Sequence, residues 1–264
     1  MVEKISKSQV LERIQFENYW WQYHSIEEDY NTMQRRLYFD IFKPMVYNRS
    51  INRAVVLMGP RRVGKTVLLH HTIQDLLEEN IPTQKIIFIT VENPIYTNIP
   101  LEELFKYALE ASGNQGPKDC FVFFDEIQYL KDWEIHLKTL VDSYRSTKFI
   151  VSGSAAAALK FKSNESGAGR FTDFLLPPLT FYEYIHINNL QHLMVESNLL
   201  WQGKEQLFYD TVDAQVLNEH FVKYINFGGY PEIIFSPQMQ KNPGRYIKQD
   251  IVDKVLLRDL PSLY

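Results

Sequence analysis

The sequence predicts a three-layer α/β fold, in which a parallel sheet of five strands carries helices on both faces and is followed by a helical C-terminal region. Three observations predict it. Short apolar runs alternate with helical patterns over residues 51–185. A complete phosphate-binding loop connects one of these strands to a helix. The alternation is then lost, and residues 186–264 have only helical patterns.

The first 50 residues are expected to form a helical segment ahead of this core. They contain no glycine, and apolar residues four apart, Val10 with Ile14 and Leu37 with Ile41, indicate helices. The same segment is rich in aromatic residues that are candidates to stack on a nucleobase, although we favour packing as their role. These are Tyr19, Trp20, Trp21, Tyr38 and Phe39.

Residues 59–66 have the pattern Gly-x-x-x-x-Gly-Lys-Thr of a phosphate-binding loop. Gly59 and Gly64 allow a tight turn, so that successive N–H groups face an anion at the start of a helix. Lys65 is suited to the β- and γ-phosphates of a nucleoside triphosphate, and Thr66 to Mg²⁺. The expected nucleotide contacts are Gly59, Pro60, Arg61, Arg62, Val63, Gly64, Lys65, Thr66 and Val67.

The residues around this loop supply the context that the motif requires. The apolar run 54–58 predicts a buried strand before it. After it, a helix is expected from about Gly64 to Glu79, because apolar residues recur on one face. That face is made by Leu69, Ile73, Leu76 and Leu77.

The alternation of strands and helices continues beyond the loop. A β-rich run at 85–91 predicts a second strand, and the apolar face of residues 101–108 predicts a helix ended by Gly113. After a third strand, Asp132 is the expected N-cap of a further helix that carries Trp133.

The third strand, residues 121–124, is followed by Asp125 and Glu126. Four consecutive apolar residues indicate a central strand, and the carboxyl end of such a strand is where ligands bind in open α/β sheets. We expect Asp125 to hold Mg²⁺ through water and Glu126 to orient and polarise an attacking water. An Asp-Glu pair is more often a solvated turn. Here, however, it closes an apolar strand about 60 residues after the phosphate loop, as in ATP-hydrolysing enzymes.

Two further side chains are candidates for the reaction. The strand 148–151 ends in Ser152-Gly153-Ser154, and Ser154 or Ser152 could sense the γ-phosphate or hold the water, with a plain Ser-Gly turn as the alternative. Arg170 lies between a polar loop and an expected fifth strand over 171–179. It is a candidate charge-stabilising arginine, in its own site or in that of a neighbouring subunit, with a surface role as the alternative.

Composition excludes several other classes. A net charge of −4 argues against a globally basic nucleic-acid binder. The single cysteine, Cys120, cannot form an internal disulfide, and the adjacent His70 and His71 make a poor metal site. There is neither a run of 18 apolar residues nor a signal-peptide core, so we expect a cytoplasmic protein with no membrane partner.

The C-terminal region is expected to be helical throughout. The segment 228–232, Gly-Gly-Tyr-Pro-Glu, predicts a sharp turn between two helices. A final amphipathic helix follows from apolar residues spaced by four, among them Ile247, Val252, Val255 and Leu256.

Six segments, in this order, resemble prokaryotic P-loop ATPases of the AAA+/STAND-related group, known as AAA-family or archaeal-type ATPases. The first two are shared with many ATPases, and the block 167–184 and the last two are more specific. The segments are GPRRVGKTVLL (59–69), FFDEIQYLKDWE (123–134), FIVSGSAAAAL (149–159), GAGRFTDFLLPPLTFYEY (167–184), GGYPE (228–232) and DKVLLRDLPSLY (253–264).

The resemblance implies an AAA+-like core and a helical lid over residues 186–264. It also implies a missing part, since longer members continue into a winged-helix segment and a nuclease-like domain where this chain ends at Tyr264. We therefore expect a protein truncated before that domain, through which it would meet a nucleic-acid or protein partner. A homo-oligomer is expected only if Arg170 acts in a neighbouring subunit.

The residues favour Mg²⁺-dependent hydrolysis of ATP that drives a conformational change. One alternative is a nucleotide-dependent signalling switch with little turnover. Another is the ATPase module of a nucleic-acid-acting protein. A small-molecule kinase is less favoured, because adjacent Asp125 and Glu126 together with a helical lid are typical of an ATPase.

Overall fold

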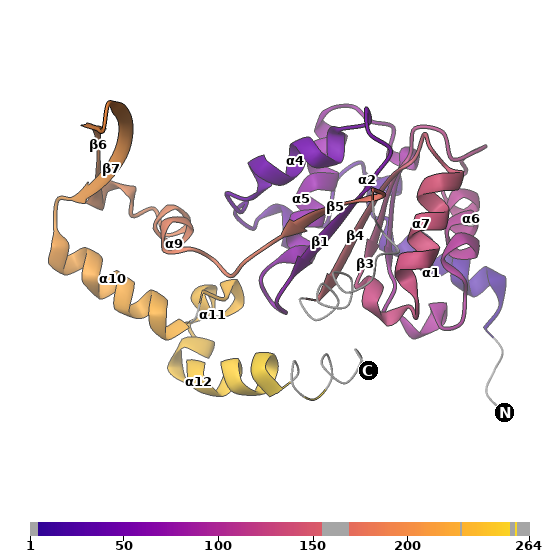
Figure 1. The fold of residues 1–264 in the computed structure, drawn as a ribbon. Coiled ribbons are helices and arrows are strands. Elements are labelled where there is room, and N and C mark those ends of the chain that lie inside the picture. The colour runs from indigo at the N-terminus through magenta and orange to yellow at the C-terminus, as the bar shows by residue number, and fades with distance from the viewer. Residues whose placement is uncertain (1–4, 155–168, 228, 254–256, 258–264) are drawn as a thin grey trace.

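The computed structural model describes residues 5–154, 169–227, 229–253 and 257 (Figure 1). Its core is a five-stranded sheet in the order β2-β3-β4-β1-β5, and every neighbouring pair is parallel. The five parallel strands predicted from the sequence are therefore confirmed. They are β1 (Ala54–Gly59), β2 (Ile86–Thr90), β3 (Phe121–Asp125), β4 (Lys148–Ser154) and β5 (Phe171–Leu175).

Two strand ends differ from the prediction. β4 continues to Ser154, because Ser152, Gly153 and Ser154 pair with β1 as the residues before them do. β5 ends at Leu175 rather than at residue 179. Pro177 and Pro178 have no N–H to give to a ladder, so the chain leaves the sheet there.

The sheet is buried on both faces between two layers of helices (Figure 1). Successive residues of a strand face opposite layers, and in β1 Val56 belongs to one apolar cluster and Val55 to the other. One layer is built from α1 (Lys7–Glu17), α6 (Leu101–Ala111) and α7 (Trp133–Ser143). The other layer is built from α2 (Trp20–Tyr23), α4 (Phe39–Tyr47) and α5 (Lys65–Glu78).

The N-terminal residues contribute to both layers, with the short helix α3 (Glu28–Asn31) beside α5. Val10 and Ile14 lie in α1, as their spacing predicted, and both are buried. Ile41 lies in α4 but Leu37 precedes that helix, and both are exposed. α4 begins only at Phe39. The residues that it buries against the sheet are Phe39, Phe42 and Val46, which are three and then four residues apart.

Packing is the role of the two most buried of the five aromatic candidates. Trp20 is completely buried, and its indole N–H donates to the Ile86 carbonyl over 2.9 Å. Phe39 is 4% exposed. Neither ring has a free face of the kind that a nucleobase needs.

Asp132 is the residue before α7, as predicted. Its side chain makes no capping hydrogen bond to the helix, so the predicted side-chain cap was wrong. Its φ of 53° and ψ of 33° are left-handed. A side-chain cap needs an extended N-cap residue, whose oxygen can then reach the first free N–H groups of the helix.

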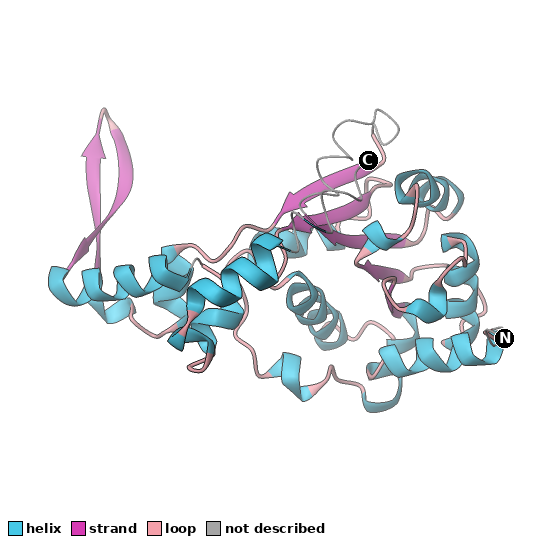
Figure 2. Cartoon of the chain, turned by 90° about the horizontal axis from the view of Figure 1, so that it is seen from below, coloured by secondary structure: helices cyan, strands magenta, loops and turns pink. Residues whose placement is uncertain are grey.

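The C-terminal region is not helical throughout. Residues 194–211 form an antiparallel hairpin of β6 (Met194–Trp201) and β7 (Lys204–Thr211), which projects away from the sheet (Figures 1 and 2). Gln202 and Gly203, with φ of 50° and 73°, make the left-handed two-residue turn that such hairpins favour. The remaining elements are α9 (Phe181–Ile187), α10 (Ala214–Phe227), α11 (Pro231–Phe235), α12 (Pro243–Tyr246) and a π-helix (Ile247–Val252).

Of the predicted turn at 228–232, Gly229 and Tyr230 lie between α10 and α11, and Pro231 and Glu232 begin α11. Gly229 has a φ of +70°, and a Cβ there would lie 2.8 Å from the Leu179 carbonyl oxygen, so only glycine fits. Other predictions fall on residues outside the described ones: the polar loop at 163–168, Gly228, and Val255 and Leu256 of the last helix. No helix in the described part of the chain is long and apolar enough to span a membrane.

Candidate nucleotide-binding site

The predicted phosphate loop connects β1 to α5 at the carboxyl edge of the sheet. Arg62 and Gly64 have positive φ values of 65° and 92°, which turn the backbone into a concavity ahead of the helix. At the other end, Gly59 packs so closely that an added Cβ would lie 2.4 Å from the Leu176 carbonyl oxygen. The two glycines of the motif are therefore needed for different reasons, conformation at Gly64 and space at Gly59.

Lys65 and Thr66 begin α5 and face the interior of the site. The Lys65 side chain is 5% exposed, and its ammonium group donates to the carbonyls of Gly59 and Pro60 over 3.1 and 3.0 Å. The Thr66 hydroxyl donates to Oδ2 of Asp125 over 2.7 Å. Two predicted parts of the site, 59 residues apart in the sequence, are thus in direct contact.

Asp125 is 2% exposed and lies at the centre of a hydrogen-bonded cluster. Its Oδ1 accepts from the Ser152 hydroxyl and from the backbone N–H of Glu126. Burial raises the pKa of this carboxyl, and the neighbouring Glu126 charge raises it further. Hard oxygen donors in a buried site suit Mg²⁺, and a cation there would stabilise the charged form of Asp125.

Glu126 has a left-handed backbone, with φ of 55° and ψ of 46°. For a residue with a side chain this conformation costs about 1–3 kcal/mol, and such strain clusters at active sites. The Glu126 carboxylate accepts from the Gln128 amide. The amide oxygen of Gln128 in turn accepts from the Ser154 N–H over 3.2 Å.

Gln128 is a site residue that the sequence reasoning missed. It lies two residues after Glu126, and no motif rule marks that position. Gly153 makes room for it, since a Cβ there would lie 3.2 Å from the Gln128 amide oxygen. Gln128 therefore ties the Glu126 carboxylate to the tip of β4.

The two serines of β4 contact this cluster differently. The Ser152 hydroxyl donates to Asp125 and accepts from the Glu126 N–H over 3.1 Å. Ser154 contributes its backbone N–H to Gln128. Of the two candidates left open by the sequence, Ser152 bonds through its side chain to both members of the acidic pair.

Arg170 lies at the opposite edge of the sheet. Its carbonyl accepts from Ala54, the first residue of β1, whereas the phosphate loop follows the last. A strand of six residues separates these edges by roughly 17 Å. The guanidinium group pairs with Asp142 on α7, so the structure does not bring Arg170 to Asp125 and Glu126 of its own chain. A role in a neighbouring subunit stays a prediction.

Residues 51–185 match the model of a family described as an AAA domain. The chain belongs to this family. AAA-type domains bind nucleotides, in agreement with the phosphate loop and the five-stranded parallel sheet.

Curated relatives of this AAA domain are themselves uncharacterized. A Methanocaldococcus jannaschii protein is 28% identical over 212 residues, which cover 76% of this chain and 44% of the relative. A Haemophilus influenzae protein is 22% identical over 205 residues, which cover 78% of this chain and 45% of that relative. The chain therefore spans less than half the length of these relatives.

Solved structures with a similar fold include the S. cerevisiae Hsp104–ADP complex, with a TM-score of 0.48 and 17% identity over 71% of this chain and 27% of that one. The Aeropyrum pernix Orc1 protein in complex with DNA has a TM-score of 0.44 and 10% identity, over 62% of this chain and 51% of that one.

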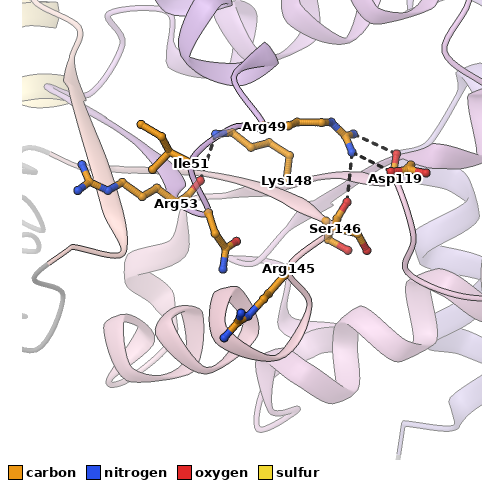
Figure 3. A pocket seen from close by; sticks show the side chains of 9 residues that line it. Arg49, Ile51, Arg53, Asp119, Arg145, Ser146 and Lys148 are labelled. Carbon is orange, nitrogen blue, oxygen red and sulfur yellow. Dashed lines mark hydrogen bonds and ion pairs between the residues drawn. The ribbon is translucent and has the colours of Figure 1, made fainter.

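A pocket of about 230 Å³ lies at the amino edge of the sheet, away from the phosphate loop of this AAA domain (Figure 3). Arg49 and Lys148 line it. Arg49 donates to the Ser146 carbonyl over 3.1 Å, and Lys148 donates to the Asn48 and Arg53 carbonyls. Burial and the Arg49 charge lower the pKa of Lys148 to about 8. Backbone carbonyls thus bind both cationic side chains, which lie at the edge of the sheet opposite the phosphate loop.

Gln128 provides a test of the acidic cluster. Replacing Gln128 with alanine removes the donor to Glu126, and we expect the maximal hydrolysis rate to fall roughly tenfold while the KM for ATP stays the same. Steady-state kinetics measure both quantities. The matched control is Gln74→Ala on α5, which removes a Gln-to-Glu contact and an acceptor for the Ile26 N–H, both outside the acidic cluster. Equal rates in the Gln128 variant and the wild type would contradict the positioning role.

His70 lies on α5 four residues after Thr66, and its side chain is packed in the interior of the protein. It is 3% exposed, its ring stacks on Tyr30 at 3.8 Å, and burial lowers its pKa to about 3. Glu27 is 4.0 Å away, but a histidine with this pKa is neutral at pH 7, so the two form no ion pair. The adjacent His71 bonds the Tyr30 carbonyl, and neither histidine is placed as a metal ligand.

This burial makes folding pH-dependent. The unfolded His70 takes up a proton below about pH 6.5 while the folded one does not, so its stabilising effect is present above that pH and is lost as the pH falls. We expect His70 to remove about 2 kcal/mol of unfolding free energy between pH 7.5 and 5. Urea unfolding of His70→Phe at both values should show a smaller decrease than wild type. The exposed control, His192→Phe, should keep the wild-type decrease.

Proposed function

We propose that this protein binds ATP with Mg²⁺, hydrolyses it and couples the reaction to a conformational change. The contact between Thr66 and Asp125 carries the proposal, because it joins the phosphate loop to the buried acid. Thr66 and Asp125 are the residues that would hold Mg²⁺. The ion would supply positive charge for the phosphate oxygens when bound.

The other residues of the site fit hydrolysis. The Lys65 ammonium group is held at the loop by two carbonyls and would exchange them for the β- and γ-phosphate oxygens of ATP. Glu126 would accept a hydrogen bond from the attacking water and orient it, with Gln128 holding its carboxylate. Positioning and electrostatics of this kind are sufficient for phosphoryl transfer, and no covalent intermediate is required.

A contact between the loop and the C-terminal region supports the coupling. Arg62 of the loop pairs with Glu232 of α11. Phosphates entering the loop would compete with Glu232 for the same guanidinium group. The contact equally favours a second candidate, a nucleotide-dependent signalling switch that retains nucleotide and turns it over slowly.

Further parts of the proposal concern partners. We place the protein in the cytoplasm and expect no membrane partner. Arg170 is exposed enough to act in a neighbouring subunit of a homo-oligomer, with 42% of its side chain accessible. A nucleic-acid or protein partner would meet the additional length that the relatives carry.

The test is phosphate release from ATP by the purified chain, with Mg²⁺ and with EDTA. The proposal expects release only with Mg²⁺ and multiple turnovers per chain. A single slow turnover with retained ADP would favour the switch, and absence of nucleotide binding would overturn both. The rate per subunit should rise with protein concentration if Arg170 acts between subunits, and adding DNA tests the nucleic-acid alternative.

A further inference from the structure

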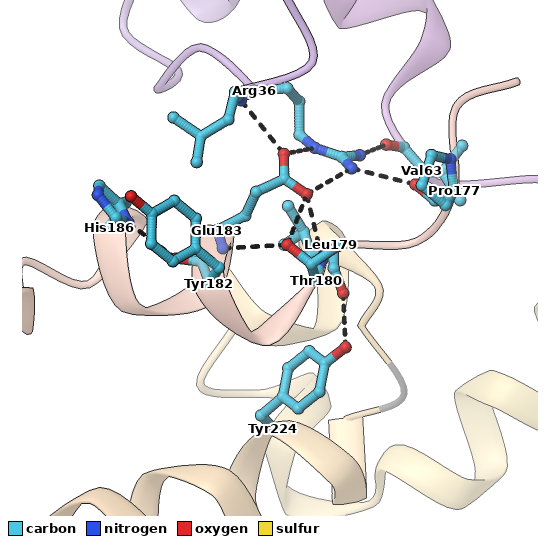
Figure 4. A network of polar contacts seen from close by, with 10 residues as sticks. Arg36, Val63, Pro177, Leu179, Thr180, Tyr182, Glu183, His186 and Tyr224 are labelled. Atoms are coloured by element: carbon cyan, nitrogen blue, oxygen red, sulfur yellow. Dashed lines mark hydrogen bonds and ion pairs between the residues drawn. The ribbon is translucent and has the colours of Figure 1, made fainter. Parts of the chain in front are cut away.

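A buried arginine and a buried glutamate connect the phosphate loop to the C-terminal region (Figure 4). Arg36 is 5% exposed and Glu183 is 1% exposed. They form two hydrogen bonds, Arg36 Nε to Oε1 over 2.7 Å and Nη2 to Oε2 over 2.9 Å. Such a two-point contact fixes orientation as well as charge.

The remaining donors of Arg36 bind two backbone carbonyls. Nη1 donates to Val63 in the phosphate loop over 2.7 Å, and Nη2 donates to Pro177 after β5 over 3.1 Å. One guanidinium group thus contacts the loop, the exit of the sheet and α9. Its flat, forked shape makes these contacts together, which a lysine cannot do.

Glu183 is equally engaged on its own side. It accepts from the backbone N–H groups of Leu37 and Thr180, over 3.2 and 3.1 Å. With Thr180 it forms the capping box that begins α9. Moving this carboxylate would therefore disturb the first turn of α9, and leaving either charge buried without the other is strongly unfavourable.

The Val63 carbonyl matters because of the peptide unit to which it belongs. In a trans peptide the carbonyl and the following N–H point in opposite directions. Arg36 holds the Val63 carbonyl, so the Gly64 N–H points away from Arg36. In a phosphate loop this N–H is one of the donors for the anion.

We propose that Arg36 is a positioning residue that holds the Val63–Gly64 peptide for phosphate and, through Glu183, reports the state of the loop to α9. This inference rests on the proposed binding of ATP. Nucleotide in the loop would stabilise the peptide orientation that Arg36 requires, and the same guanidinium group would then hold α9 more firmly. The start of α9 would loosen when the loop is empty.

The first test replaces Arg36 with lysine in the full chain. Lysine keeps a positive charge for Glu183 but loses the fork, and we expect ATP affinity to fall roughly tenfold, with kcat within about twofold of wild type. The matched control is Arg49→Lys. Arg49 also donates to a carboxylate and to backbone carbonyls, but at the other edge of the sheet. This control should keep wild-type affinity.

A purely structural role would lower the melting temperature of Arg36→Lys and leave the ATP affinity of the folded protein unchanged, which would overturn the positioning role. If wild type binds ATP and the variant binds equally well, only this inference fails. If wild type binds no nucleotide, the proposed function fails and the inference fails with it.

The second test begins with the wild-type chain, so its first result does not depend on a variant that folds. Hydrogen exchange of residues 181–187 is measured with and without saturating ADP. The inference expects slower exchange with ADP, and expects Arg36→Lys to lose most of that protection. Unchanged exchange at α9 in a wild type that demonstrably binds ADP would overturn the link between loop and helix.

Discussion

Replacing Glu126 with glutamine is expected to leave ATP binding within about twofold of wild type and to lower the maximal hydrolysis rate by a factor of about 10²–10⁴. Glutamine keeps the size of the side chain but cannot accept the proton of the attacking water. Because Asp125, Thr66 and Lys65 are untouched, the phosphate and cation sites should remain. Phosphate release and ATP titration of the same preparation measure the two effects.

A matched control makes the same Glu-to-Gln change at a glutamate outside the acidic cluster. Glu110→Gln changes an exposed glutamate near the end of α6 that pairs with Lys7, and should hydrolyse ATP at the wild-type rate. Turnover by Glu126→Gln equal to wild type would remove Glu126 from the mechanism and shift attention to Asp125 and Ser152.

Replacing Lys65 with alanine is expected to weaken ATP binding by at least about 100-fold, which abolishes binding at ordinary concentrations. In the proposed function, the ammonium group is the positive charge that would face the phosphates. Its loss also leaves the Gly59 and Pro60 carbonyls without their donor. Titration with a fluorescent ATP analogue measures the affinity.

Lys65→Arg is the informative companion variant, because it keeps the charge but is too broad for the space between two carbonyls. We expect it to bind ATP more weakly than wild type and more tightly than Lys65→Ala. If Lys65→Ala bound ATP as wild type does, the loop would not be the nucleotide site and the proposed function would fall.

The local features of this protein were determined by its sequence. Strands β1 and β3 are apolar up to their last residue because both faces of a parallel sheet are covered, so the runs before Gly59 and Asp125 predict them directly. The loop between β1 and α5 needs glycine and lysine at set positions. Since parallel strands end at one edge, the meeting of Thr66 with Asp125 also followed from the sequence.

Hairpin β6–β7 shows where pattern reading fails. Its two strands are mostly exposed on both faces, so no alternation of apolar and polar residues distinguishes them from helix. The recognisable sequence signal is at the Gln202-Gly203 turn, where glycine permits the left-handed backbone.

The connections of the site were decided by the tertiary structure alone. Glu183 lies 147 residues from Arg36, and only the packing of α9 beside the loop makes them partners. Gln128 reaches Ser154 because Gly153 leaves space on a neighbouring strand, and Arg170 is separated from the loop by the length of β1. A motif specifies the residues that touch a ligand through local backbone geometry. The residues that hold a motif in place depend on contacts between distant segments, for which sequence spacing carries no rule.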